Sequence, residues 1–334
     1  MLLDSARGLK QALTDTVLAP FIAAGSLMKE LAVPAGSIAG VAPVQPSIAL
    51  GIGRSTGHEF RLAVRCQRSE LLKSKEVEQI RKKAKDEVDI RYIGPVTKQA
   101  SPWPQQRHRP LAIGVSIGHV KVTAGTLGAF VKKRGAEGVL ILSNNHVLAN
   151  ENRGKTGDVI LQPGLLDDGQ DPADRVATLA GRVALEKTKS NAVDAAIAAL
   201  VEGIEFDPRT IRGLGKLAGL GAEFVDVGTE VAKLGRTTGL TRGRVTAFEL
   251  DNVVVNFDTG PKRFNGQIEI EGEGDDPFSL GGDSGSLILE AGTRLAVALL
   301  FAVSNVGGSN NQGLTYANPL RTVLDALKVD LVSG

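Results

Sequence analysis

The sequence predicts a mainly β protein, with two six-stranded antiparallel β-barrels preceded by a small ββαβ module and N-terminal helices. Three observations indicate this fold class. From Leu111 onward, short apolar segments alternate with glycine-rich turns, and almost no helical spacing occurs. These segments form two sets of about six, as a pair of antiparallel barrels requires. Upstream of Leu111, strand-like and helix-like patterns follow one another in the order β-β-α-β.

Length and composition indicate a folded cytoplasmic protein. The 334 residues are enough for two or three domains with their own cores, and 42% of them are hydrophobic. The formal net charge of +2 favours neither nucleic acid nor an anionic membrane as a partner. The single cysteine, Cys66, has no internal disulfide partner, which suits a reducing compartment. Neither a secretory leader nor an apolar run of about 18 residues is found in the sequence.

Residues 1–46 are predicted to form N-terminal helices and a linker. Apolar residues recur at helical spacing up to Val17, and Pro20 is expected to end the helix. A second apolar segment, Phe21–Val33, precedes a stretch rich in Gly, Pro and Ala that is typical of a linker. The apolar faces need a surface to pack on, so we expect these helices to contact the protein body or to support a homo-oligomer.

Residues 47–98 are predicted to form the small α+β module. Phe60–Cys66 alternates apolar with polar or charged residues as a half-buried strand does, and Ser69–Glu87 carries a helical apolar stripe. Strand alternation then resumes. The glycines of Gly51–Gly57 lack the spacing of a dinucleotide-binding loop and precede a strand, so a hairpin turn is predicted there. Residues 99–110, which are basic and rich in proline, are expected to be an exposed connector.

The two predicted barrels occupy residues 111–206 and 207–334. In the first barrel we expect strands at Ile113–Val120, Thr126–Val131, Val139–Ser143, Asp158–Gln162, Val176–Val183 and Ala195–Val201. In the second barrel we expect strands at Glu230–Leu234, Gly243–Leu250, Val253–Phe257, Gln267–Glu271, Ser286–Leu289 and Arg294–Val303. A C-terminal helix follows, with Asn318 as its N-cap, Pro319 in its first turn and an apolar face that begins at Leu320.

Three motifs supply the parts of a nucleophilic active site. Ser284 lies in Gly-Gly-Asp-Ser-Gly-Ser, where the flanking glycines allow a sharp turn and bring N–H groups close to whatever the serine attacks. A serine hydroxyl is a weak nucleophile at neutral pH, so it requires a general base and a group that orients the base. The base candidate is His146, at the end of a predicted strand, and the orienting candidate is Asp194.

The motifs occur in the order His, Asp, Ser, which differs from the subtilisin order and from the Ser-first order of the α/β-hydrolases. Their local sequences are Ser-Asn-Asn-His-Val-Leu, Val-Asp-Ala-Ala-Ile and Gly-Asp-Ser-Gly. On these motifs, from roughly Leu111 to Val329, the sequence resembles the trypsin/chymotrypsin-fold serine peptidases. It is closest in character to their disulfide-free bacterial branches, such as the HtrA-type and glutamyl-specific enzymes. The N-terminal third lies outside the resemblance.

The resemblance implies a chymotrypsin-like pair of barrels and a serine endopeptidase that acts on polypeptides through an acyl-enzyme. Ser284 would be the nucleophile, His146 the general base and Asp194 the residue that orients the imidazole. The oxyanion hole would be formed by backbone N–H groups of Gly282 and Ser284, in the segment that includes Asp283. Substrate-binding residues would be Phe278, six positions before the serine, and the strand segment Leu300, Phe301, Ala302 and Val303, which would bind an extended peptide.

Asp283 carries a separate question about activation. In trypsin-like zymogens the equivalent aspartate pairs with a new N-terminal amine after cleavage, and here a basic connector precedes Leu111. We expect instead that the N-terminal module stays attached and that Asp283 pairs with a Lys, an Arg or backbone N–H groups.

Each motif also has a structural interpretation, because a histidine after a strand, an aspartate beside one and a Gly-Asp-Ser-Gly turn are all common. Two other functions stay open: a peptide-binding pseudoprotease without turnover, and an acyl hydrolase of small esters. His58, His108 and His119 have no partners at metal-ligand spacing, so neither a metal nor a cofactor is predicted.

Overall fold

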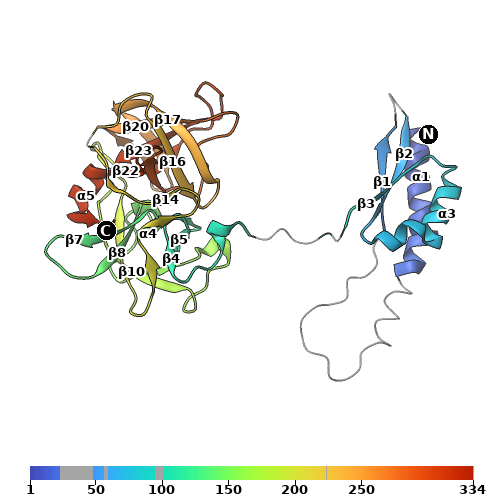
Figure 1. The fold of residues 1–334 in the computed structure, drawn as a ribbon, viewed down its shortest axis with the longest axis horizontal. Helices are drawn as coiled ribbons and strands as arrows, with labels where there is room; N and C mark the ends of the chain where they lie inside the picture. Colours follow the sequence, from blue (N-terminus) through green and yellow to red (C-terminus); the bar gives the residue numbers. More distant parts are fainter. Residues whose placement is uncertain (23–47, 56–58, 95, 97–100, 223, 334) are drawn as a thin grey trace, which may run out of the picture. The chain divides into compact units, whose positions relative to one another are not determined.

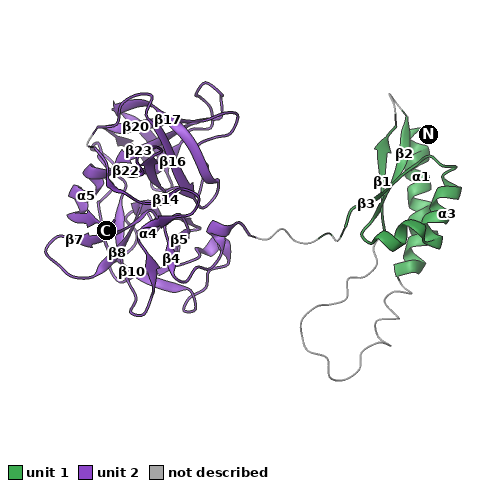
Figure 2. Ribbon diagram, in the orientation of Figure 1, with its two compact units in different colours: residues 1–100 green, residues 101–334 purple. Residues whose placement is uncertain are grey.

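The computed structural model describes residues 1–22, 48–55, 59–94, 96, 101–222 and 224–333. The chain divides into two compact units, Met1–Ala100 and Ser101–Gly334, shown in different colours in Figure 2. Each unit has its own hydrophobic core, and each is described here by itself. No helix in the described ranges is long and apolar enough to span a membrane.

The first unit contains a three-stranded sheet in the order β1 (Ile48–Arg54), β2 (Phe60–Cys66), β3 (Val88–Tyr92). β1 and β2 are antiparallel, and β3 joins β2 in parallel after the helix α3 (Lys75–Lys83). A short 3₁₀ segment, Ser69–Lys73, precedes α3. The predicted ββαβ order is therefore confirmed.

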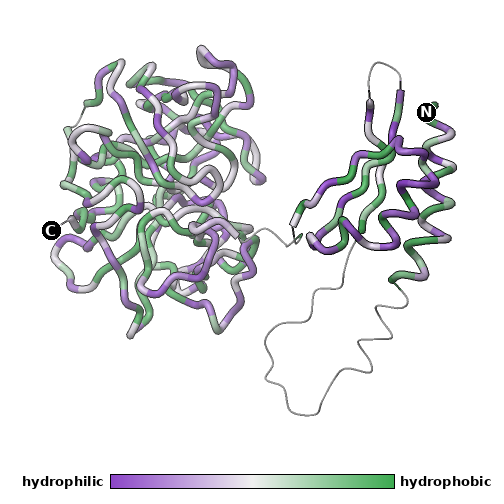
Figure 3. Tube along the Cα trace, turned by 45° about the vertical axis from the view of Figure 1, so that its right-hand side comes forward, coloured by the Kyte–Doolittle hydropathy of each residue, from purple (hydrophilic) through white to green (hydrophobic). Residues whose placement is uncertain are grey.

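The N-terminal helix covers this sheet with its apolar face. α1 (Leu3–Leu13) continues through a π-helical segment, Thr14–Leu18, and residues 19–22 are helical as well. In Figure 3, hydrophobic and hydrophilic residues alternate along α1 as expected for a helix with one apolar side. Its buried residues share one core with the sheet: Ala6 is fully buried, and Leu13, Val17 and Leu18 pack with Leu62, Val64 and Cys66.

The prediction that Pro20 ends the helix was wrong. The N–H of Ala19 bonds to the carbonyl of Thr14 in the π-helical segment, and such a local change of register lets a helix accommodate a proline. Most of the predicted second apolar segment and the linker, residues 23–47, lie outside the described residues. Because the stripe of α1 packs on its own sheet, it no longer supplies the reason for expecting a homo-oligomer.

The second unit contains a closed barrel of six strands (Figure 1). In barrel order the strands are β22 (Leu295–Val303), β21 (Leu287–Glu290), β16 (Glu230–Gly235), β17 (Gly239–Leu250), β20 (Gln267–Gly272) and β23 (Leu314–Pro319), and pairing of β22 with β23 closes the ring. Antiparallel pairing throughout this ring confirms the predicted second barrel.

One predicted strand of this barrel lies elsewhere. Val253–Phe257 forms β18, which pairs with β19 (Gly260–Phe264) in a separate two-stranded hairpin between β17 and β20. The sixth barrel strand is β23, which the sequence pattern did not single out. Alternation shows that a segment is a strand, but β18 and β19 are joined by a two-residue turn, and so they pair with each other first.

The other sheet is a curled sheet of eight strands rather than a closed ring of six. Its order is β24 (Val329–Leu331), β7 (Ala129–Lys133), β8 (Val139–Ser143), β11 (Ala196–Leu200), β10 (Arg175–Arg182), β9 (Val159–Leu161), β5 (Ser116–His119) and β6 (Gly125–Thr126). Five of the six predicted strands are present, and the sixth, Thr126–Val131, is divided between β6 and β7, which lie far apart in the sheet order. β24 adds one further strand beside β7. β24 comes from the end of the chain, so the C-terminal segment returns to the first sheet.

The remaining elements of this unit are short. They are η3 (Trp103–Gln105), β4 (Leu111–Ala112), α4 (Asn145–Leu148), η4 (Leu165–Asp167), β12 (Phe206–Asp207), β13 (Thr210–Ile211), β14 (Gly215–Lys216), β15 (Gly219–Leu220) and α5 (Leu320–Leu327). The largest core contains residues of both sheets and the buried face of α5, which the sequence predicted. A second core, centred on Phe278, fills the closed barrel. The fold is therefore that of a chymotrypsin-like double barrel, with the first barrel open between its end strands.

Candidate active site

His146 and Asp194 are brought together by the pairing of β8 with β11. Ala196 lies opposite Ser143 in this antiparallel pair. Asp194 comes two positions before Ala196 and His146 three positions after Ser143, so the two residues meet where the paired strands end. There α4 begins, directly after the strand, and presents the imidazole of His146 to Asp194. The His146 Nδ1 to Asp194 Oδ2 distance is 2.5 Å, and the backbone N–H of His146 donates to Asp194 Oδ1 at 3.3 Å.

Two asparagines hold Asp194 in this position, and neither was predicted to belong to the site. Asn144 donates through Nδ2 to the carbonyl of Asp194 at 2.8 Å. Asn318 accepts the N–H of Asp194 at 2.9 Å and donates to Gln267 at 2.6 Å. Asn318 was predicted to cap α5, but its side chain does not cap the helix and is instead fully buried beside Asp194. The position of Asn144 two residues before His146 in its motif was the one available signal.

The surroundings of His146 favour its protonated form. Burial of the imidazole disfavours its positive charge and lowers the pKa. The Asp194 carboxylate raises the pKa through its negative charge and its hydrogen bond, and the negative charge of Glu151 raises it further. The pKa of His146 is therefore raised. The imidazole side chain is 21% exposed whereas that of Asp194 is fully buried, so the ring can still receive a proton from the solvent side.

Ser284 lies on the turn that packs against the same strand end. Its carbonyl accepts the N–H of Thr126 at 2.8 Å, and the next residue, Gly285, donates to Leu300 at 2.8 Å. A Cβ at Gly285 would fall 2.1 Å from Ser143 Oγ, at the end of β8, so only glycine fits this close approach. The side chain of Ser284 makes no hydrogen bond to His146 or to any other described residue.

A shared neighbour confirms that the two turns adjoin. A Cβ on Gly125 would fall 2.4 Å from the Val147 side chain and 3.0 Å from the Ser284 carbonyl oxygen. The residue after His146 and the carbonyl of Ser284 therefore both contact Gly125, where the first sheet meets the closed barrel.

Two N–H groups on the serine turn are unpaired among the described residues. These are the N–H groups of Gly282 and Ser284, which have no acceptor. The N–H of Asp283 donates to the Leu280 carbonyl at 3.0 Å, so Asp283 does not belong to the predicted oxyanion hole. Gly282 adopts a φ of +96°, a conformation that favours glycine, and a Cβ there would collide with the Thr237 side chain.

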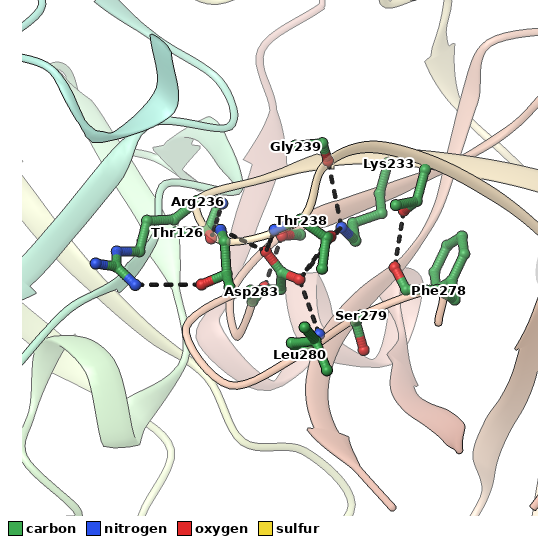
Figure 4. A network of polar contacts seen from close by, with 12 residues as sticks. Thr126, Lys233, Arg236, Thr238, Gly239, Phe278, Ser279, Leu280 and Asp283 are labelled. Atoms are coloured by element: carbon green, nitrogen blue, oxygen red, sulfur yellow. Dashed lines mark hydrogen bonds and ion pairs between the residues drawn. The ribbon is translucent and has the colours of Figure 1, made fainter. Parts of the chain in front are cut away.

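The Asp283 carboxylate is fully buried and anchors the turn, as Figure 4 shows. It accepts hydrogen bonds from the N–H groups of Thr237 at 2.8 Å and Leu280 at 3.0 Å, and from the Thr238 hydroxyl at 2.8 Å. The Lys233 ammonium lies 3.4 Å away and is equally buried. The expectation that Asp283 pairs with a lysine and backbone groups is therefore confirmed.

Burial lowers the pKa of Lys233, and the nearby Asp283 carboxylate partly opposes this. The Lys233 ammonium also donates to Thr238 and lies 5.7 Å from the centre of the Phe278 ring. Phe278 was predicted to bind substrate, but it is 1% exposed and belongs to the core of the closed barrel. Phe278 was predicted from its position six residues before Ser284. Its side chain instead packs against Lys233 and Gly243 inside the closed barrel.

A further ion pair holds the adjacent loop of the first sheet. Arg236 binds Asp167 through two contacts, at 2.5 Å and 2.7 Å, and both side chains are largely buried. Thr126 links this pair to the serine turn, because its hydroxyl accepts the N–H of Arg236 at 3.1 Å and donates to the Gly282 carbonyl at 3.0 Å.

The remaining predicted substrate residues lie on β22. Leu300 and Phe301 are buried, whereas Ala302 and Val303 are half-buried. Ala302 and Val303 line a cavity of about 530 Å³ together with residues of β18. Phe257, at the end of β18, lies edge-on to the His146 ring with 5.8 Å between the ring centres.

Two of the other histidines have structural partners, and His58 lies outside the described residues. His119 contacts Asp158 at 3.0 Å, and His108 Nε2 lies 2.6 Å from the Trp103 carbonyl. No group of three or more His, Cys, Asp or Glu side chains in the described part of the chain is arranged to hold a metal ion.

Comparisons with known proteins add the following findings. Residues 210–323 match the model of the Nal1 C-terminal domain. None of the curated proteins matches the sequence. Protease A of Thermobifida fusca is 18% identical with a TM-score of 0.46, over 67% of this chain and 100% of that one. A chymotrypsin of Cellulomonas bogoriensis is 21% identical with a TM-score of 0.45, over 67% and 99%. A serine protease specific for glutamic acid is 22% identical with a TM-score of 0.46, over 66% and 100%.

Proposed function

We propose that the chain is a serine endopeptidase that hydrolyses peptide bonds through His146, Asp194 and Ser284. The observation that carries the proposal is the hydrogen bond between His146 Nδ1 and the fully buried Asp194 carboxylate. It leaves Nε2 as the nitrogen that faces away from Asp194, and it raises the pKa of His146, as a general base requires. The turn that carries Ser284 packs on the same strand end.

The chemistry follows from this arrangement. The Ser284 oxygen attacks the scissile carbonyl while His146 Nε2 accepts the hydroxyl proton, and Asp194 stabilises the imidazolium that forms. The tetrahedral oxyanion accepts hydrogen bonds from the unpaired N–H groups of Gly282 and Ser284. Each such donor stabilises the transition state by about 3–4 kcal/mol in comparable enzymes. His146 returns the proton to the leaving amine, and water then cleaves the acyl-enzyme by the same steps in reverse order.

Two features of the structure bear on how the proposed enzyme becomes active. The Ser284 hydroxyl has no hydrogen bond to His146, and such contacts often shorten only when substrate binds. Asp283 is already neutralised by Lys233 and by N–H groups, so we propose that activity needs no new N-terminus near Leu111. The N–H of Leu111 is itself bonded to the Glu205 carbonyl, within a strand.

The cellular setting is part of the same proposal. We assign a polypeptide substrate, no nucleic acid and a cytoplasmic location. The location is proposed because the sequence has a single cysteine, Cys66, which has no internal disulfide partner.

The direct test is labelling of the wild type and of Ser284→Ala with a fluorophosphonate probe, together with cleavage of unfolded casein. We expect the wild type to be labelled and to cleave casein with turnover, and Ser284→Ala to do neither. Ser286→Ala is a matched control on the same turn, because the Ser286 hydroxyl is buried and donates to the Asp283 carbonyl. Labelling of Ser284→Ala would contradict the assignment.

One observation favours a second candidate, a peptide-binding pseudoprotease. It is the absence of a hydrogen bond between Ser284 and His146 in the described structure. This alternative predicts casein binding without cleavage and no labelling of the wild type. Turnover of small esters with no cleavage of casein would instead indicate an acyl hydrolase.

A further inference from the structure

The hairpin β18–β19 presents an open strand edge beside the candidate active site. Asn256 lies opposite Pro261 and Phe257 opposite Gly260. Pro261 has no N–H, so its pair with Asn256 is not hydrogen-bonded, and alternate pairs carry the hydrogen bonds of the hairpin. The backbone N–H and C=O groups of Val254 and Asn256 therefore point away from β19. Neither residue has another backbone partner among the described residues.

The outer edge of β19 is already occupied. The N–H of Asn191 donates to the Arg263 carbonyl at 2.8 Å, and the N–H of Asn265 donates to the Asn191 carbonyl at 3.0 Å. Arg263 lies opposite Val254, and its carbonyl points away from β18, which agrees with the hydrogen-bond alternation derived from Pro261. Of the two edges of this hairpin, the one on β18 is the edge left open.

Glu151 fixes the tip of the hairpin to the first sheet. Its carboxylate accepts the N–H of Asp258 at 2.9 Å and the N–H of Thr259 at 2.8 Å. Glu151 is largely buried, and these hydrogen bonds outweigh its burial and lower its pKa, so it stays ionised at neutral pH. β18 is therefore held in a fixed position close to His146.

β22 presents a second open edge toward the same space. The N–H of Ser304 donates to the Leu314 carbonyl of the neighbouring segment at 2.8 Å, which identifies Ser304 and Leu314 as a hydrogen-bonded pair. Val303 lies opposite Thr315, one position along, so its N–H and C=O point away from β23. Beyond Leu300, which bonds to Ser286, β22 has no partner on that side among the described residues.

Residues of both open edges line one cavity. Its volume of about 530 Å³ lies within the range of about 300–1,000 Å³ that is usual for ligand sites, and it is lined by residues 250–256 and by Ala302, Val303, Ser304 and Tyr316. Along β18 the wall ends at Phe257, against the His146 ring, and along β22 it begins next to the serine turn.

We propose that the substrate is bound as an extended strand between β18 and β22 and forms backbone hydrogen bonds with both edges. This inference rests on the proposed function and adds to it a second, sequence-independent binding edge at Val254 and Asn256. An extended polypeptide is the ligand that fits, because its N–H and C=O groups alternate between its two sides at the spacing of a strand. Folded proteins lack such a free segment, so the expected substrate is an unfolded region or a chain terminus.

Replacement of single substrate amides by esters distinguishes one binding edge from two. A bond that the wild type cleaves in oxidised insulin B chain is first mapped by mass spectrometry. Peptides spanning this bond are then made with one ester in place of one amide at each position other than the scissile one. If the substrate is bound on one edge, an ester removes a hydrogen bond only at every second position. If the substrate is bound on both edges, an ester removes a hydrogen bond at each of several consecutive positions.

We expect kcat/KM to fall about five- to tenfold for each of three consecutive ester positions on one side of the scissile bond. Losses at every second position alone would overturn the inference and leave the proposed function intact. Absence of any Ser284-dependent cleavage of the insulin B chain would overturn the proposed function and this inference with it.

The variant Val254→Pro provides a second test, because it removes an N–H from the open edge without removing a hydrogen bond of the hairpin. We expect it to lower kcat/KM for the all-amide peptide about five- to tenfold, because the substrate carbonyl that faces Val254 loses its N–H donor. Val254→Thr, which keeps the N–H, is the matched control and is expected to keep the wild-type kcat/KM. Fluorophosphonate labelling at the wild-type rate shows that each variant is folded. An unchanged kcat/KM in a Val254→Pro protein that labels normally would overturn the inference.

Discussion

At the residue scale, His146 is subject to two opposing effects on its charge. Burial disfavours the imidazolium, while Asp194 and Glu151 favour it and prevail. In the proposed mechanism only the neutral imidazole can accept the proton of Ser284. We therefore expect kcat/KM to rise with pH as His146 loses its proton, at a pH above the ordinary histidine pKa of about 6.5.

Replacement of Asp194 by Asn tests this balance. Without the carboxylate charge the pKa of His146 falls, so the acidic limb of the pH profile of kcat/KM is expected to move to lower pH. The rate itself should fall about 10⁴-fold, because the amide no longer holds the required tautomer. Asp158→Asn is the matched control, since it removes the carboxylate from the other histidine–aspartate contact, at His119. An acidic limb that stays in place in Asp194→Asn would contradict the assigned pair.

At the scale of elements, the serine turn is positioned by the strand β16. Lys233 comes from this strand and meets Asp283 inside the closed barrel, where both side chains are fully buried. Removing one partner of a buried pair leaves an uncompensated charge, which costs far more than the pair itself contributes. The turn is also tied to the first sheet by Thr126, so its conformation depends on elements from both sheets.

The variant Lys233→Met is therefore expected to lower the free energy of unfolding by about 3–5 kcal/mol, measured by urea denaturation. In the double variant Lys233→Met/Asp283→Asn the charge left behind is also removed, so part of this stability should return. Fluorophosphonate labelling of the folded single variant should slow as the turn loses its anchor. If the double variant loses more free energy of unfolding than the sum of the losses in the two single variants, the result would argue against a buried ion pair at this position.

At the scale of the whole molecule, the fold could largely be predicted from the sequence. Alternating apolar residues identified the strands, and the order of the three motifs placed them at a seam between two β-domains. β23 was missed because Asn318 and Pro319 were interpreted as the start of a helix, although they complete a strand. The pairing of β18 was not predictable from alternation, which does not identify a partner.

The candidate site was predictable where its chemistry depends on which residue types occur and in what order. It was less predictable where the role of a residue depends on the orientation of its side chain. His146 and Asp194 were singled out together, and the structure places them in contact. Asn318 was assigned to a cap and Phe278 to a substrate site, because which way a side chain points is decided by packing across the fold. Glu151 had no signal in the sequence, since its partners are backbone groups far along the chain.

The most direct test of the central claim is a crystal structure of the full-length protein after reaction with diisopropyl fluorophosphate. We predict an uncleaved chain with phosphorus bonded to Ser284 Oγ and a phosphoryl oxygen accepting the N–H groups of Gly282 and Ser284. His146 Nε2 should lie within hydrogen-bond distance of the adduct while Nδ1 keeps its contact with Asp194. Phosphorus bonded to another residue, or a His146 ring turned away from the adduct, would contradict the account.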